Sequence, residues 1–188
     1  MKIGILGGTF NPLHYGHLIL GEYVRDYLKL DKVIFIPCNI PPHKAEDRLL
    51  SSKLRLRLLK VALKKSKYFR VKSLEIDRGG ISYTVDTLLQ IKKMYPKDKL
   101  FLIIGSDLFK GFGSWHKPKT ILKLAKVVVV LREALRKKSK GFIFISMPKI
   151  EISSSLIRKR IKQGKSIRYL VPEEIIPSIV KAKRRLGK

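Results

Sequence analysis

Cysteine and long apolar runs are scarce in this sequence of 188 residues. Cys38 is the single cysteine, which excludes an internal disulfide framework and a metal site built from several thiolates. No apolar run reaches the roughly eighteen residues that a membrane span needs, and only Lys2 precedes the first short one. We therefore expect a cytoplasmic protein without a membrane segment.

Acidic residues are also few, with 14 Asp and Glu against 42 Lys and Arg and a formal net charge of +28. Such an excess of cations favours anionic partners, among which polyphosphates and nucleic acids are both candidates. The cations are spread along the chain, with clusters at 136–140 and 181–185, and no series of base-stacking aromatic residues accompanies them. This pattern is typical of a solvated basic surface. We expect no specific nucleic acid partner, and a basic nucleic-acid-binding module is the non-enzyme alternative.

Short aliphatic segments bounded by glycine, proline or charge predict five buried strands, at residues 2–6, 32–36, 70–76, 99–104 and 126–131. Apolar residues with helical spacing predict helices between these strands, around 18–28, 54–62 and 85–92, with a shorter one at 118–124. Two more helices are expected at 156–163 and 172–185. Alternating strands and helices predict an α/β fold, a Rossmann-like parallel sheet with right-handed crossovers and helices on both faces.

The length fits one domain over 1–188, with an α/β core at 1–150 and a small C-terminal helical segment at 151–188. In a parallel sheet, ligands bind at the carboxyl ends of the strands. The loops that follow the predicted strands should therefore share one rim of the sheet. These loops cover residues 7–17, 37–50, 77–83 and 105–116.

A phosphate-binding arrangement opens the chain, where a strand leads through Gly7 and Gly8 into a helix that starts near Gly16. Glycines let the backbone approach a ligand, and a helix start offers N–H donors to an anion. The spacing matches neither the dinucleotide fingerprint nor the P-loop. If His14 lies just before the helix and His17 opens it, both imidazoles can face one anion. A metal site is the less favoured alternative, because carboxylates and thiols are missing nearby. A third alternative is that both imidazoles serve only in packing or capping.

The segment GGTFNPLHYGHL resembles the signature of the HxGH nucleotidyltransferase superfamily. Four later blocks resemble, in order, those of the bacterial nicotinate-nucleotide adenylyltransferases: PCNIPPHK (37–44), GGISYTVDTL (79–88), IIGSDLFKGFGSW (103–115) and ISSSLIR (152–158). The resemblance covers nearly the whole chain, as a single nucleotidyltransferase domain. Two positions depart from the usual pattern, with Asn11 in place of Asp and Ser155 in place of Thr. Asn11 weakens any proposal of a carboxylate–metal contact there.

The resemblance implies transfer of AMP from ATP to nicotinate mononucleotide, which forms deamido-NAD and pyrophosphate in NAD biosynthesis. It makes His14, His17, Lys44 and Arg158 the catalytic candidates. No protein residue is expected to bind metal directly, and the implied Mg²⁺ is held mainly by ATP phosphates and water. The implied ATP contacts are Gly8, Thr9, Phe10, His14, His17, Gly105, Asp107, Ser154, Ser155 and Arg158. Ser154 and Ser155 should also cap their helix.

The acceptor contacts implied by the resemblance are Tyr83, Thr84 and Trp115. Tyr83 and Thr84 should start a helix whose backbone donors meet the pyridine carboxylate, while the Trp115 indole stacks on the ring. Charge-assisted hydrogen bonds are roughly twice as strong as neutral ones, which favours nicotinate over nicotinamide. Nicotinamide mononucleotide or another phosphorylated acceptor is the alternative substrate. No oligomeric state is predicted.

Overall fold

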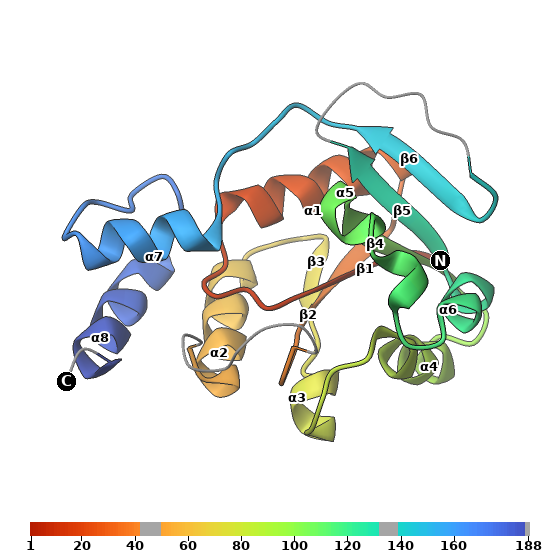
Figure 1. The fold of residues 1–188 in the computed structure, drawn as a ribbon, viewed down its shortest axis with the longest axis horizontal. Coiled ribbons are helices and arrows are strands. Elements are labelled where there is room, and N and C mark those ends of the chain that lie inside the picture. The colour runs from red at the N-terminus through yellow and green to blue at the C-terminus, as the bar shows by residue number, and fades with distance from the viewer. Residues whose placement is uncertain (42–49, 132–138, 187–188) are drawn as a thin grey trace.

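The computed structural model describes residues 1–41, 50–131 and 139–186. Six parallel strands form one sheet in the order β3-β2-β1-β4-β5-β6 (Figure 1). Every neighbouring pair is parallel. The strands are β1 (Lys2–Gly8), β2 (Lys32–Pro37), β3 (Phe69–Val71), β4 (Lys99–Gly105), β5 (Lys126–Leu131) and β6 (Phe142–Ser146).

Helices cover both faces of this sheet, which confirms the predicted Rossmann-like α/β class. The α-helices are α1 (Tyr15–Leu28), α2 (Ser52–Leu63), α3 (Leu74–Arg78), α4 (Thr84–Met94), α5 (Ser106–Phe109), α6 (Pro118–Leu124), α7 (Ser154–Lys162) and α8 (Ile176–Leu186). Two 3₁₀ turns, η2 (Phe112–Ser114) and η3 (Glu173–Ile175), complete the described elements. No helix in these described ranges is both long enough and apolar enough to span a bilayer.

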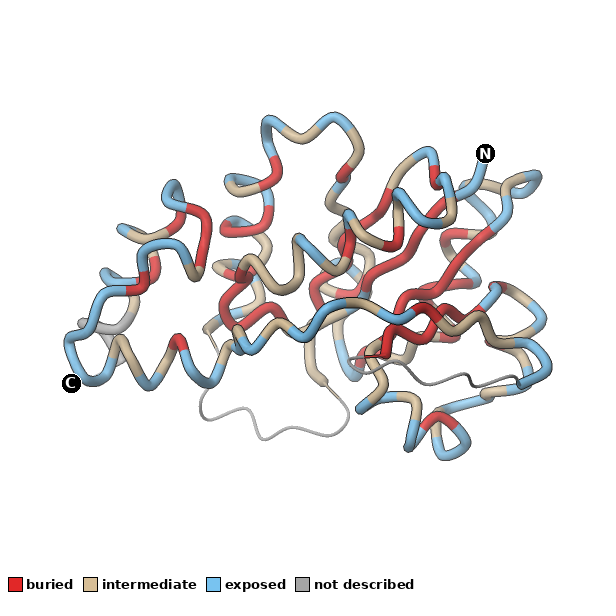
Figure 2. The backbone as a smooth tube through the Cα atoms, turned by 90° about the horizontal axis from the view of Figure 1, so that it is seen from above, coloured by how far each residue is buried: buried red, intermediate tan, exposed pale blue. Residues whose placement is uncertain are grey.

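Alternating strand residues supply two hydrophobic cores, one on each face of the sheet. In β2, Val33 and Phe35 enter the core shared with α1, α2, α7 and α8, while Ile34 and Ile36 enter the core shared with α4 and α6. Successive side chains of a strand point to opposite faces, so a strand covered on both sides is apolar at every position. Figure 2 shows buried residues running continuously along the central strands.

The prediction differs from the structure at both edges of the sheet, by one strand boundary and by one strand that was not predicted. The strand expected at 70–76 ends at Val71, and helix α3 follows it. The helix places the buried Glu75 carboxylate where the Thr87 hydroxyl of α4 donates to it at 2.7 Å, an interaction that a continued strand would not provide. Strand β6 has no counterpart among the predicted strands, although Phe142–Ile145 form the short continuous apolar run that is typical of a buried strand. The predicted helices at 156–163 and 172–185 correspond to α7, η3 and α8.

Candidate active site

The loop between β1 and α1 carries both histidines of the amino-terminal motif. His14 is the N-cap residue of α1 and His17 lies in its first turn. Their rings stack with centroids 3.7 Å apart and an interplanar angle of 28°. The His14 backbone N–H donates to Nδ1 of His17 at 3.3 Å, and the Phe10 ring meets His17 edge-on. The first turn of α1 therefore holds the two imidazoles side by side.

His14 is only 6% exposed, and burial lowers the pKa of its imidazole to about 4. A buried base that finds no compensating partner stays neutral, because desolvation penalises its charged form. Within the described residues, Nδ1 of His14 has no hydrogen-bond partner. At neutral pH, His14 is therefore an uncharged imidazole whose Nδ1 is buried without a hydrogen-bond partner among the described residues.

The backbone N–H groups at the start of α1 are less available than the sequence suggests. Tyr15 N–H donates to the Leu170 carbonyl at 3.0 Å, and His17 N–H donates to the His14 carbonyl at 2.9 Å. The prediction of unpaired donors at this helix start is therefore wrong for these two groups. The Leu170 contact forms because the chain between α7 and η3 packs against the loop, which the local sequence does not indicate.

Helix α7 brings the carboxyl-terminal motif against this same loop. Arg158 Nη1 donates to the Asn11 carbonyl at 2.8 Å, and the Ser154 hydroxyl donates to the Pro12 carbonyl at 2.9 Å. The peptide bond between Asn11 and Pro12 is cis. Motifs 147 residues apart in the chain thus meet next to the histidine pair.

The three serines at the start of α7 have roles that differ from the predicted ones. Ser153 is the N-cap, and its hydroxyl accepts from Leu156 N–H at 3.1 Å. The predicted capping by Ser154 and Ser155 is therefore wrong. Three consecutive serines do not indicate which one is the N-cap, and the helix begins at Ser154, directly after Ser153. The Ser155 hydroxyl instead accepts from Arg158 Nη2 at 3.1 Å and helps to orient the guanidinium.

The predicted acceptor residues lie in the loops after α3 and β4. Tyr83 is the N-cap residue of α4 and Thr84 begins that helix, as predicted. Trp115 is half-buried, with its ring 5.3 Å from that of Phe112. The His116 ring lies 4.6 Å from the Tyr83 ring, a contact that the motifs alone do not signal.

The remaining predicted ATP contacts lie at the ends of β1 and β4. Gly8 ends β1, with Thr9 and Phe10 directly after it, and the Phe10 side chain is buried. Gly105 ends β4 and precedes α5, whose first turn holds the exposed Asp107. All of these residues follow the carboxyl ends of parallel strands. Lys44 lies outside the described residues.

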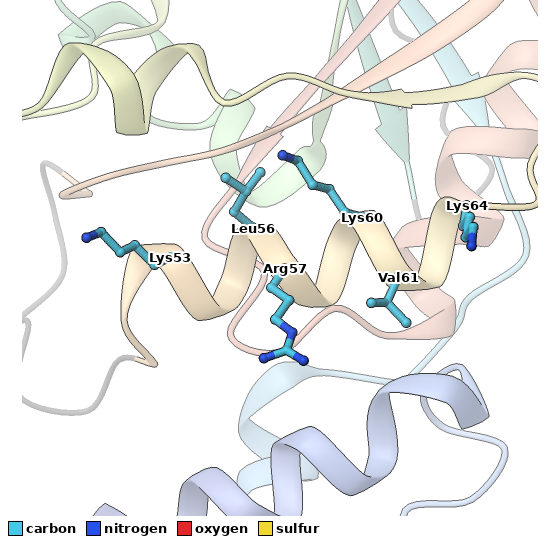
Figure 3. Close-up of a pocket in the computed structure, with 6 residues that line it drawn as sticks. All are labelled: Lys53, Leu56, Arg57, Lys60, Val61 and Lys64. Atoms are coloured by element: carbon cyan, nitrogen blue, oxygen red, sulfur yellow. The ribbon is translucent and has the colours of Figure 1, made fainter.

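The described residues offer no cluster of three or more His, Cys, Asp or Glu side chains that could hold a metal ion. A shallow hollow of about 610 Å³ lies elsewhere, on the outer face of α2 (Figure 3). It is lined by Lys53, Leu56, Arg57, Lys60, Val61 and Lys64. None of these six residues belongs to the predicted site.

The fold, together with the contact between the two distant motifs, allows comparison with known proteins. Residues 5–160 match the Cytidylyltransferase-like family, which sets the class of this chain. A protein of Dictyoglomus thermophilum named "Probable nicotinate-nucleotide adenylyltransferase" is 44% identical over 96% of this chain and 97% of its own length. A protein of the same name from Borreliella burgdorferi is 43% identical over 95% of this chain and 94% of its own. The chain belongs to the nicotinate-nucleotide adenylyltransferase family.

Solved structures support the fold. The Plasmodium falciparum nicotinic acid mononucleotide adenylyltransferase complexed with NaAD superposes with a TM-score of 0.76. That likeness covers 99% of this chain and 96% of the other at 20% identity. At so low an identity, the similarity concerns the arrangement of helices and strands.

Proposed function

We propose that this protein transfers the AMP moiety of ATP to the phosphate of nicotinate mononucleotide, giving deamido-NAD and pyrophosphate. The observation that carries this function is full-length similarity to the nicotinate-nucleotide adenylyltransferase family. The contact of Arg158 with the loop that holds His14 supports it, because it places a cationic side chain beside that loop. An oxygen of the acceptor phosphate attacks the α-phosphorus, and the bond from that phosphorus to the pyrophosphate oxygen breaks.

The attacking phosphate is already an anion, so the reaction needs no enzyme nucleophile and no base. The chain has to align two polyanions and stabilise charge on the α-phosphate and on the leaving pyrophosphate. In our proposal His14 and His17 contact the ATP phosphates, while Lys44 and Arg158 hold the leaving group. Gly8, Thr9, Phe10, Gly105, Asp107, Ser154 and Ser155 complete the proposed ATP contacts.

The acceptor half of the proposed site contains Tyr83, Thr84 and Trp115. The start of α4 directs backbone N–H groups and a partial positive charge outward, which suits the pyridine carboxylate. The half-buried Trp115 offers an aromatic face to the ring. This arrangement favours nicotinate over nicotinamide, because the neutral amide forms weaker hydrogen bonds with the same donors.

Magnesium enters the proposal with the substrate, as the complex of ATP in which phosphate oxygens and water coordinate the ion. A cytoplasmic location and a single domain over residues 1–188 stay predictions from the sequence.

A competition assay tests the function. The purified protein receives MgATP with equal concentrations of nicotinate and nicotinamide mononucleotides, and both dinucleotide products are quantified. We expect deamido-NAD to dominate by about fivefold or more, since a charged partner strengthens such a hydrogen bond by about 1 kcal/mol. Dominant NAD formation would reassign the acceptor. Absence of turnover with every phosphorylated acceptor would refute the proposed function.

A further inference from the structure

A buried arginine lies beneath the candidate site and belongs to none of its motifs. Arg55, in the first turn of α2, is 1% exposed. Burying a guanidinium is costly unless its N–H groups are hydrogen-bonded. Arg57, two residues further along the same helix, is exposed. The burial of Arg55 is therefore specific to its position on α2.

Backbone carbonyls from three separate segments satisfy this guanidinium. Nη1 donates to Thr9 O at 2.9 Å and to Cys38 O at 2.7 Å. Nη2 donates to Asn39 O and Nε to Leu50 O, each at 2.9 Å. The planar fork of arginine has five N–H donors in fixed directions, and four of them are used here. Such an arrangement fixes the relative positions of the backbone segments that supply the carbonyls.

Two of these segments belong to opposite halves of the candidate site. Thr9 lies in the loop that continues to the histidine pair, whereas Asn39 leads to the acceptor side. Asn39 N–H donates to the Ser82 hydroxyl at 2.9 Å, and Ser82 N–H donates to the Ile40 carbonyl at 2.9 Å. Ser82 directly precedes Tyr83, the N-cap of α4. Hydrogen bonds through Arg55 and Asn39 thus connect the loop between β1 and α1 with the start of α4.

We propose that Arg55 is a positioning residue for the reaction. It holds the loop between β1 and α1, which contacts the ATP phosphates in our proposal, and the segment that leads into α4, which contacts the acceptor, at the separation required for in-line transfer. This inference rests on the proposed function. Each substrate binds mainly through its own half of the site, but the reaction needs the attacking oxygen and the α-phosphorus within about 3–3.5 Å. Loss of Arg55 should therefore lower kcat while leaving both KM values nearly unchanged.

The test compares Arg55→Lys and Arg55→Met with two control variants. Lysine keeps the charge, but its single ammonium group cannot reach four carbonyls that surround a planar fork. Arg57→Met makes the same change at an exposed site, and Leu59→Ala removes a fully buried side chain of α2 that faces the core. All variants are assayed well below their melting temperatures, with kcat and both KM values measured.

We expect kcat of the Arg55 variants to fall about 10- to 100-fold, because a misplacement near 1 Å has about this effect, with each KM within about threefold. Leu59→Ala should lower the melting temperature and keep kcat within about twofold. Arg57→Met should change neither. Folded Arg55 variants with the kcat of Leu59→Ala would overturn the proposal.

Hydrogen exchange gives a readout that does not depend on turnover. In Arg55→Lys, peptides covering 36–41 and 79–84 should exchange faster than in wild type, and in the two controls they should not. Unchanged exchange overturns the proposal, whereas an inactive wild type refutes the proposed function alone. If the Arg55 variants do not fold, Ser82→Ala weakens the same connection on its acceptor side, because it removes the hydroxyl that accepts from Asn39 N–H. A kcat at least about fivefold lower supports the proposal, and a wild-type kcat overturns it.

Discussion

His14 links the protonation of one imidazole to folding. Its pKa is about 4 in the folded chain against 6.5 for an ordinary histidine. Between these values the unfolded chain binds more protons than the folded one, so stability rises with pH across this window. The contribution is fully present above pH 6.5 and is lost as pH falls from 6.5 to 4.

We expect the free energy of unfolding to drop by about 2 to 3 kcal/mol between pH 7 and 4.5 on account of His14, at 1.36 kcal/mol per pKa unit. Urea denaturation at the two pH values measures this drop. His14→Gln removes the titrating group and should reduce the difference by that amount. Parallel pH profiles for wild type and His14→Gln would contradict the assignment.

His17 tests the proposed phosphate contact at the same scale. It is only partly buried, so His17→Ala should shift the melting temperature little. Loss of a group that stabilises developing charge commonly lowers turnover by a factor of about 100 to 1,000, and we expect kcat to fall in this range. Steady-state kinetics and a thermal melt are compared on the same preparation. Equal loss of fold and activity would instead indicate that His17 serves only in packing.

At the scale of elements, the start of α1 is packed between its own histidine and the approach to α7. A methyl group on Gly16 would lie 3.0 Å from His14 Nδ1 and 3.2 Å from the Ile152 carbonyl oxygen. Both distances are shorter than ordinary van der Waals contact, so one neighbour would have to move. Helix α7, which carries Arg158, and the imidazole of His14 are the groups that would shift.

Gly16→Ala should therefore reduce kcat by about tenfold or more, since small displacements of aligned groups are costly in rate. Gly21→Ala, on the same helix, is the matched control, because its methyl group would lie 3.1 Å from the ring of Phe35, a core residue of β2. That variant should lower the melting temperature and keep kcat within about twofold. Similar kinetics for the two variants would show that α1 does not transmit strain to the site.

At the scale of the whole molecule, the net charge of +28 gives the surface a strong positive potential. The exposed cations Lys53, Arg57, Lys60 and Lys64 lie together on α2 (Figure 3), and among the described contacts none of them forms an ion pair. Like charges three or four residues apart repel each other on a helix. This face should therefore attract polyanions without sequence preference.

We expect the protein to bind heparin and to elute at lower salt when these four cations are changed to glutamate. The control reverses four other exposed lysines, Lys97, Lys119, Lys123 and Lys126. Both variants have the same net charge, so a lower elution salt for the α2 variant shows that the clustered cations contribute most. Equal elution would show that total charge alone governs binding. Deamido-NAD formation should persist in the α2 variant.

The sequence determined which segments could be strands and helices, because apolar periodicity and turn residues act over a few positions. It predicted the central strands, the helices between them and the place of His14 and His17 at the start of α1. The order of the motifs was sufficient to suggest the family.

Only the tertiary structure decided which distant groups satisfy one another. Glu75 accepts a hydrogen bond from Thr87 in a helix that replaces the end of the expected strand. The Leu170 carbonyl accepts from the first N–H of α1, and Arg158 donates to the Asn11 carbonyl. Arg55 looks like one more cation in the sequence, yet it is buried among carbonyls of three segments. The physical reason is that a buried polar group takes its partners from whatever packs around it, and packing is set by the whole chain.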